Sequence, residues 1–264
     1  MSLAAVPDGN QMHIAGTGVL QPGRQLRTWD GVPVAWVTDW AYGSAGIYWT
    51  CVSEESAESG LQPFLLADMT REPARPWGTG ELISDPEDTT AIDAMDAARL
   101  LERWWDIRVP GEEEFAEDEE LREMLAPFGL RFPGLAPAVE EELDPELVRR
   151  AVFQYTRDAR IGLVPAARPA DILPRLGWQG GGTTASELAV VLRSWEDRFG
   201  ARLMQVGFAE IRLLVNRPPQ TLETAQPIAA EHFAFSDEAH IGLRGVGDIA
   251  RAVVNNPFWD FWWD

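Results

Sequence analysis

Apolar and polar residues alternate in short runs over the first 70 residues of the chain. The runs 32–37, 46–52 and 61–67 are rich in bulky apolar residues and are separated by Gly, Pro and Asp, which typically mark turns. We therefore expect three short strands there, forming a small and mostly antiparallel sheet.

A helical period replaces this alternation further along the chain. Apolar residues recur three or four positions apart from Ile92 to Trp105, after an N-cap candidate within 85–88, which predicts a helix that ends at Asp106. A second, acidic helix is expected over 112–126, ending before Pro127. Residues 127–145 contain four prolines and two glycines and are typical of an irregular connector.

The C-terminal part of the chain has the clearest periodicity. We expect a strand over 160–166, a short helix ending at Gly177, and a helix that Thr183 or Thr184 caps and Gly200 ends. Segments 202–206 and 210–215 predict a hairpin around Gly207, followed by helices over 222–235 and 246–255.

This order of elements predicts an α+β fold. We expect an N-terminal, mostly antiparallel β region with helices and an acidic helical segment over residues 1–145. A C-terminal domain over residues 146–264 is expected to form a β-α-β-β-α-α layer with its helices on a sheet face. A chain of 264 residues is compatible with one large domain or two modest ones.

The composition excludes several chemistries. All 22 basic residues are Arg and none is Lys, so the chain has neither a Schiff-base lysine nor a phosphate loop of the usual lysine-containing kind. Its one cysteine, Cys51, rules out an intrachain disulfide, and no serine lies in a G-x-S-x-G turn. We expect no metal and no cofactor, and a cytoplasmic protein, because the chain has no run of about 20 apolar residues and no secretory signal.

The formal charge of −20 is concentrated in one segment. Residues 81–146 hold 21 acids and 5 Arg, a net charge of −16, whereas residues 147–264 hold 13 acids and 13 Arg. Within the segment, seven of the nine residues 112–120 are acidic. Such a run is compatible with a solvated helix face or with a surface that binds a cationic partner. It disfavours nucleic acid, because binding to phosphates depends on Lys and Arg.

Several segments resemble one bacterial family. LRSWEDRFGARL (192–203), RPPQTLETAQPIAAEHFAF (217–235) and the terminal FWDFWWD (258–264) are similar to domain-of-unknown-function family 4253, DUF4253. SGLQPFLLAD (59–68), RPWGTGEL (75–82) and LLERWWD (100–106) add to the resemblance, although Gln62 stands where we expect a Trp. The resemblance implies no agreed activity, cofactor or catalytic residue.

The helix over 184–199 contains the first candidate binding residues, Arg193, Trp195 and Arg198. The two guanidinium groups could hold an anion through their planar, forked donors, and Gly180–Thr184 could add free N–H groups at the helix start. The alternative is a packed helix with Trp195 in the core and a charged outer face.

His232 is the best candidate for proton transfer near neutral pH. Its neighbour Glu231 is a poor partner, because adjacent helix residues do not face each other, and a helix-terminal or core histidine is the alternative. A metal site formed by His240 with Asp237 and Glu238 is a further alternative.

The terminal segment contains five aromatic residues in six positions, among them the candidate binding residues Trp259 and Trp262. Left in water these rings would form an apolar patch, so we expect them to pack onto the sheet of this chain. The alternative is a homodimer contact or a partner's groove. The scatter of the 12 Trp along the chain favours packing over stacking platforms for sugars or bases.

These observations favour a non-enzymatic, acidic, cytoplasmic module that binds a basic protein, without membrane or nucleic-acid partners. One version is an immunity or antitoxin protein that neutralises a cationic effector. The alternative is an enzyme or small-anion sensor with a cleft between the two lobes, using His232 with Arg193 or Arg198.

Overall fold

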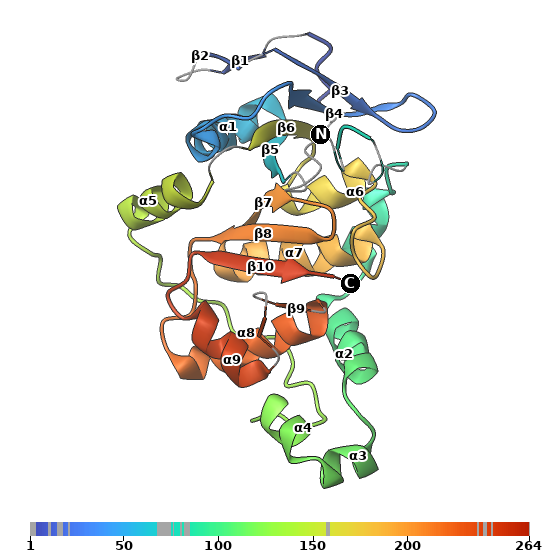
Figure 1. Ribbon diagram of the computed structural model, residues 1–264, viewed down its shortest axis with the longest axis vertical. Coiled ribbons are helices and arrows are strands. Elements are labelled where there is room, and N and C mark those ends of the chain that lie inside the picture. Colours follow the sequence, from blue (N-terminus) through green and yellow to red (C-terminus); the bar gives the residue numbers. More distant parts are fainter. Residues whose placement is uncertain are drawn as a thin grey trace.

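Eight strands of the described chain form one mixed sheet, as a computed structural model shows (Figure 1). The structure describes residues 4–9, 12–14, 18–20, 22–67, 75, 77–79, 81, 85–156, 159–236, 238–239, 242–243 and 245–263. The strand order is β3-β4-β6-β5-β7-β8-β10-β9, and β5 with β7 is the parallel pair. The strands are β3 (Gly23–Arg27), β4 (Pro33–Thr38), β5 (Leu61–Leu66), β6 (Arg160–Pro165), β7 (Ala201–Val206), β8 (Glu210–Val215), β9 (Glu238–Ala239) and β10 (Phe258–Trp262). A separate antiparallel pair consists of β1 (Met12–Ile14) and β2 (Gly18–Leu20).

Strands from both halves of the chain alternate within this sheet. β6, from the C-terminal half, lies between β4 and β5, and β5 in turn joins β7. The fold is therefore α+β, as predicted, with one sheet that runs through both proposed domains. The division at residue 145 stays a prediction about independent folding units.

Helices cover the two faces of the sheet and enclose two apolar clusters. The larger cluster lies under the C-terminal helices and the helix that contains Trp105, and the smaller lies under the helices that contain Trp49 and Val152. The helices are α1 (Ala45–Ser59), α2 (Ala97–Arg108), α3 (Glu112–Glu117), α4 (Glu119–Met124), α5 (Pro145–Tyr155), α6 (Ile172–Leu176), α7 (Ala185–Phe199), α8 (Leu222–Phe235) and α9 (Val246–Val253), with 3-10 turns η1 (Thr89–Ala94) and η2 (Pro169–Asp171).

The predicted strand over 46–52 is wrong, because this segment belongs to helix α1. Ala45, Trp49 and Val52 lie three or four positions apart and are buried on one side of the helix. Gly60, at φ 67°, ends the helix in the left-handed conformation. Seven residues are too few to separate a period of two from a period of 3.6.

Three further helical segments differ from the prediction. The expected helix from Ile92 to Asp106 is interrupted, because Ile92 lies in the 3-10 turn η1 and Asp96 caps a separate helix, α2, which runs to Arg108. The acidic segment forms two short helices rather than one, because Asp118 ends α3 and caps α4. Helix α5 begins at Pro145, where only a connector and a boundary were expected, with the Asp144 carboxylate accepting the N–H of Glu146 at 3.0 Å.

The C-terminal predictions are confirmed. Thr184 caps α7 and Gly200 ends it at φ 60°, β7 and β8 form the hairpin, and α8 spans the expected residues. The last helix ends slightly early, at Val253. The terminal segment pairs with β8 as strand β10, which buries Trp259 and Phe261 against the helices.

Candidate functional site

The predicted residues Trp195 and Arg198 converge on a carboxylate of the same chain. Glu231 on α8 is fully buried, and it accepts hydrogen bonds from Nη1 and Nη2 of Arg198, both at 2.7 Å. The indole Nε1 of Trp195 donates at 2.7 Å, and the backbone N–H of Ala136 donates at 2.6 Å. The anion that Arg198 holds is therefore Glu231, and this cluster ties α7, α8 and the connector together.

Arg193 also binds internal carboxylates. Its Nε donates to Asp171 at 2.7 Å and its Nη1 donates to Asp93 at 2.6 Å, so it ties α7 to both 3-10 turns. Burial alone would lower the pKa of Arg193, but the hydrogen bonds and charges of the two aspartates outweigh burial and raise it. The guanidinium stays charged as part of the structure.

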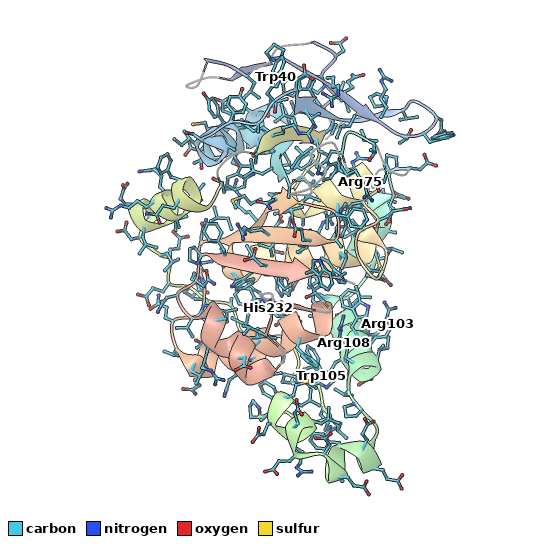
Figure 2. The ribbon with its side chains drawn as sticks, viewed as in Figure 1. Trp40, Arg75, Arg103, Trp105, Arg108 and His232 are labelled. Carbon is cyan, nitrogen blue, oxygen red and sulfur yellow. The ribbon has the colours of Figure 1, made fainter. Side chains whose placement is uncertain are left out.

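His232 lies inside an aromatic cluster (Figure 2). Its ring centroid is 5.0 Å from Trp195, 4.4 Å from Trp259 and 4.9 Å from Phe261. Trp262 points to the opposite sheet face, since side chains alternate along β10, and it is half-buried.

One sheet runs through both halves of the described chain, so Arg193, Arg198 and His232 lie within a continuous fold rather than between two separate lobes. None of the pockets described below is lined by His232, Arg193 or Arg198. Of the metal alternative, His240 and Asp237 lie outside the described residues. In the part of the chain that the structure describes, no group of three or more His, Cys, Asp or Glu could hold a metal ion.

The helix start at Gly180–Thr184 is already occupied by an internal anion. The Glu87 carboxylate accepts the backbone N–H of Ala185 at 3.0 Å and that of Ser186 at 2.8 Å. The first turn of α7 therefore has its negative partner within the chain.

The acidic helices α3 and α4 form an ordered projection, which we call the acidic lobe (residues 112–124). It lies at the end of the molecule opposite β1 and β2 (Figure 1). Hydrogen bonds between side chains and the backbone, rather than ion pairs, order it. The Asp118 carboxylate accepts the N–H groups of Glu120 and Leu121, and the Arg122 side chain donates to the carbonyls of Phe115 and Ala116.

The carboxylates of the acidic lobe face solvent. Residues 112–124 contain eight acids and one Arg, a net charge of −7, and all eight acids are exposed. No ion pair joins them to Arg side chains within the described part of the chain. Leu125, fully buried behind the lobe, anchors it to the larger cluster, where Trp105 donates to the Leu130 carbonyl at 3.1 Å.

A pocket of about 520 Å³ lies between α4 and the start of α9. Leu121 and Met124 supply its apolar part, and acids line its edge. Gly245 permits the close approach of the two helices, since a Cβ there would lie 3.1 Å from the Met124 carbonyl oxygen. The acids are Asp118, Glu120, Glu123 and Asp248, the last of which pairs with Arg251 at 2.5 Å.

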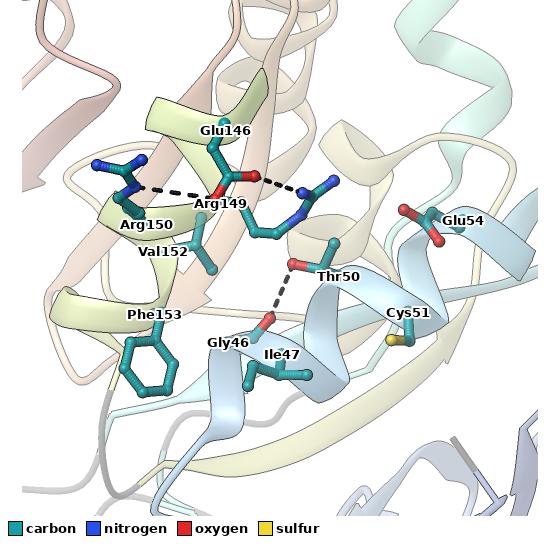
Figure 3. A pocket seen from close by; sticks show the side chains of 10 residues that line it. All are labelled: Gly46, Ile47, Thr50, Cys51, Glu54, Glu146, Arg149, Arg150, Val152 and Phe153. Carbon is teal, nitrogen blue, oxygen red and sulfur yellow. Dashed lines mark hydrogen bonds and ion pairs between the residues drawn. The ribbon is translucent and has the colours of Figure 1, made fainter. Parts of the chain in front are cut away.

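A second pocket, of about 500 Å³, lies between α1 and α5 (Figure 3). Apolar side chains such as Ile47 and Phe153 line it beside the thiol of Cys51. Burial raises the pKa of the Cys51 thiol, and the nearby carboxylates of Glu54 and Glu55 raise it further, so the group remains a thiol at neutral pH. The charges on its rim balance, because Arg149 and Arg150 face Glu146 and Glu54.

Together, the fold and these surfaces define an α+β protein with structural internal ion pairs and an outward acidic lobe. Residues 160–264 match the family described as Domain of unknown function (DUF4253), which confirms the predicted resemblance over this part of the chain. No curated protein and no solved structure matches the chain. No helix in the described part is long and apolar enough to span a membrane.

Proposed function

We propose that this protein is a non-enzymatic binding module that docks a basic partner protein on its acidic lobe. The observation that supports this proposal is the ordered, outward display of eight carboxylates against one Arg over residues 112–124. A negative field of this kind accelerates encounter with a cationic surface and disfavours acidic competitors.

The acidic lobe is already ordered, and this should favour affinity for a partner. Because Asp118 and Arg122 already hold the two short helices in place, a partner would not have to order them on binding. The C-terminal part, residues 147–264, is neutral overall and serves as the scaffold.

The pocket between α4 and α9 suggests how a basic side chain would be recognised. The alkyl stem of a Lys or Arg from the partner would lie along Leu121 and Met124, and its cation would lie among Asp118, Glu120 and Glu123. This arrangement would add shape complementarity to a contact that is otherwise only electrostatic.

Two triple variants with equal charge change test the proposal. E119Q/E120Q/E123Q lowers the net charge of the acidic lobe from −7 to −4, whereas E140Q/E141Q/E142Q removes the same amount of charge from the exposed connector. We expect affinity capture from cells at low salt to retain basic proteins that high salt releases. The lobe variant should lose them, and the connector variant should retain them.

The proposal fails if both variants retain the same proteins, if retention is equal at low and high salt, or if the retained proteins are not basic. An immunity or antitoxin role is one version of it. That version requires a captured partner that is toxic when expressed alone and harmless when co-expressed with this protein. We also propose a cytoplasmic location, which fits a chain whose one cysteine is unpaired.

A further inference from the structure

The pocket between α1 and α5 opens onto a surface that we call the α1–α5 face (Figure 3). One outward stripe of each helix forms it: Ile47, Cys51 and Glu54 on α1, and Arg149, Arg150 and Phe153 on α5. Helix α5 packs on the chain along one side, and Val152 alone is buried among its described side chains. The α1–α5 face is therefore open to solvent in a single copy of the described chain.

The apolar part of this face consists of Ile47 and Phe153, which are 46% and 47% exposed. Figure 3 shows them where the end of α5 meets the start of α1. The two helices approach closely there, since a Cβ on Gly46 would lie 2.7 Å from Val152. Single exposed apolar residues are common on soluble proteins, but two beside one pocket form a patch that association can bury.

The charged part of the face carries both signs, and they lie on different helices. Arg149 and Arg150 on α5 share the carboxylate of Glu146, whose oxygens lie 2.7 Å from Arg149 Nη1 and 3.8 Å from Arg150 Nε. All three side chains are more than half exposed, so these ion pairs are weak and can exchange partners. Glu54 on α1 is exposed, and none of the ion pairs in the described part of the chain includes it.

A face of this kind is complementary to itself. A two-fold axis brings the same patch of two copies together, so that α5 of each copy can lie over α1 of the other. Arg149 and Arg150 of each copy would then face Glu54 of the other. Other surfaces of two copies repel, because the chain has a net charge of −20, whereas the two Arg and two Glu that line this pocket sum to zero.

We propose that the α1–α5 face binds a second copy of this chain and forms a symmetric dimer. Ile47 and Phe153 would be buried at the centre of the interface, and the Arg and Glu side chains would pair around them. The face lies away from the acidic lobe, so the two lobes of a dimer would stay apart (Figure 1). Helices of 15 and 11 residues form a small interface, which favours a dimer in equilibrium with the monomer.

Sedimentation velocity over about a hundredfold range of protein concentration tests this proposal. The wild type should shift from monomer to dimer as the concentration rises. The variant F153D should weaken the dimer about tenfold or more, because it places a charge at the apolar centre of the interface. L222D is the matched control, since Leu222 on α8 is 44% exposed, and this variant should associate like the wild type.

An exchange of charges tests the two-fold arrangement itself. R149E/R150E makes the charged stripes of both helices negative, and E54R/E58R makes them positive, with Glu58 lying one turn beyond Glu54 on α1. Each variant alone should stay monomeric, because like charges then face each other. An equimolar mixture should form a heterodimer, since each α5 then faces an α1 of opposite charge. The control E140R/E141R, in the exposed connector, should form homodimers like the wild type.

The thiol of Cys51 locates the interface, because this residue is the only cysteine of the chain and lies in the α1–α5 face. Its reaction with a maleimide should slow as the wild type dimerises. The substituted side chains are exposed, so all variants should unfold near the wild-type temperature. The proposal is wrong if the wild type is monomeric at every concentration, if F153D and L222D associate equally, if the mixture forms no heterodimer, or if Cys51 reacts at the same rate in monomer and dimer.

Discussion

Removal of Arg198 should be among the most destabilising single changes in this protein. The substitution R198M takes away two of the four donors around the Glu231 carboxylate and leaves a fully buried charge with Trp195 and Ala136. Breaking one partner of a buried pair typically costs about 3–5 kcal/mol, mainly because the other charge stays buried. Two lost charge-assisted hydrogen bonds, at about 1.5–3 kcal/mol each, give an overlapping range of about 3–6 kcal/mol.

A double-mutant cycle separates this pairing from simple loss of packing. E231Q alone should also destabilise, because its amide nitrogen would face the donors of Arg198. In R198M/E231Q no charge is buried, so the combined loss in the free energy of unfolding should be smaller than the sum of the two single losses by about 2 kcal/mol. Urea denaturation followed by Trp fluorescence measures all four proteins.

The control for this cycle is R251M. Arg251 pairs with Asp248 on the surface of α9, where both side chains are at least half exposed, so its loss should change stability by less than about 0.5 kcal/mol. Additive effects of R198M and E231Q, or a loss for R198M no larger than that for R251M, would refute the reasoning.

Three further predictions concern other parts of the fold. Burial raises the pKa of Glu196 from 4.5 to about 7, so the folded protein holds this proton more tightly than the unfolded chain does. The stability of the wild type relative to E196Q should therefore fall as the pH rises from about 4.5 to 7. Thermal unfolding across that range measures this, and equal pH profiles for the two proteins would contradict it. G46A should destabilise by about 1–3 kcal/mol despite the better helix propensity of Ala, because its Cβ would lie 2.9 Å from the Val152 carbonyl oxygen and push α5 from α1. Urea denaturation checks this, and an unchanged midpoint would contradict it. E87A should cost about 1–2 kcal/mol and speed amide exchange in the first turn of α7, since it removes the partner of Ala185 N–H; exchange at wild-type rates would count against that role.

Only part of the candidate sites could be predicted from the sequence. The acidic lobe follows from charge density alone, because a run of acids cannot be buried without partners. The pocket between α1 and α5 was missed, because its lining residues come from two helices that the sequence pattern did not predict.

The sequence by itself determined the elements whose signals are local. Helix α7 has a cap at Thr184, an apolar stripe and a Gly at its end, and the hairpin turns at Gly207. These features depend on neighbours within one or two turns of the chain, so periodicity and turn chemistry suffice to predict them.

The tertiary structure decided everything that depends on distant partners. It inserted β5 between β6 and β7, made 46–52 helical, and brought Arg198 to Glu231, 33 positions later. The physical reason is that a guanidinium attracts any nearby carboxylate, and only the packing of sheet and helices determines which one is near.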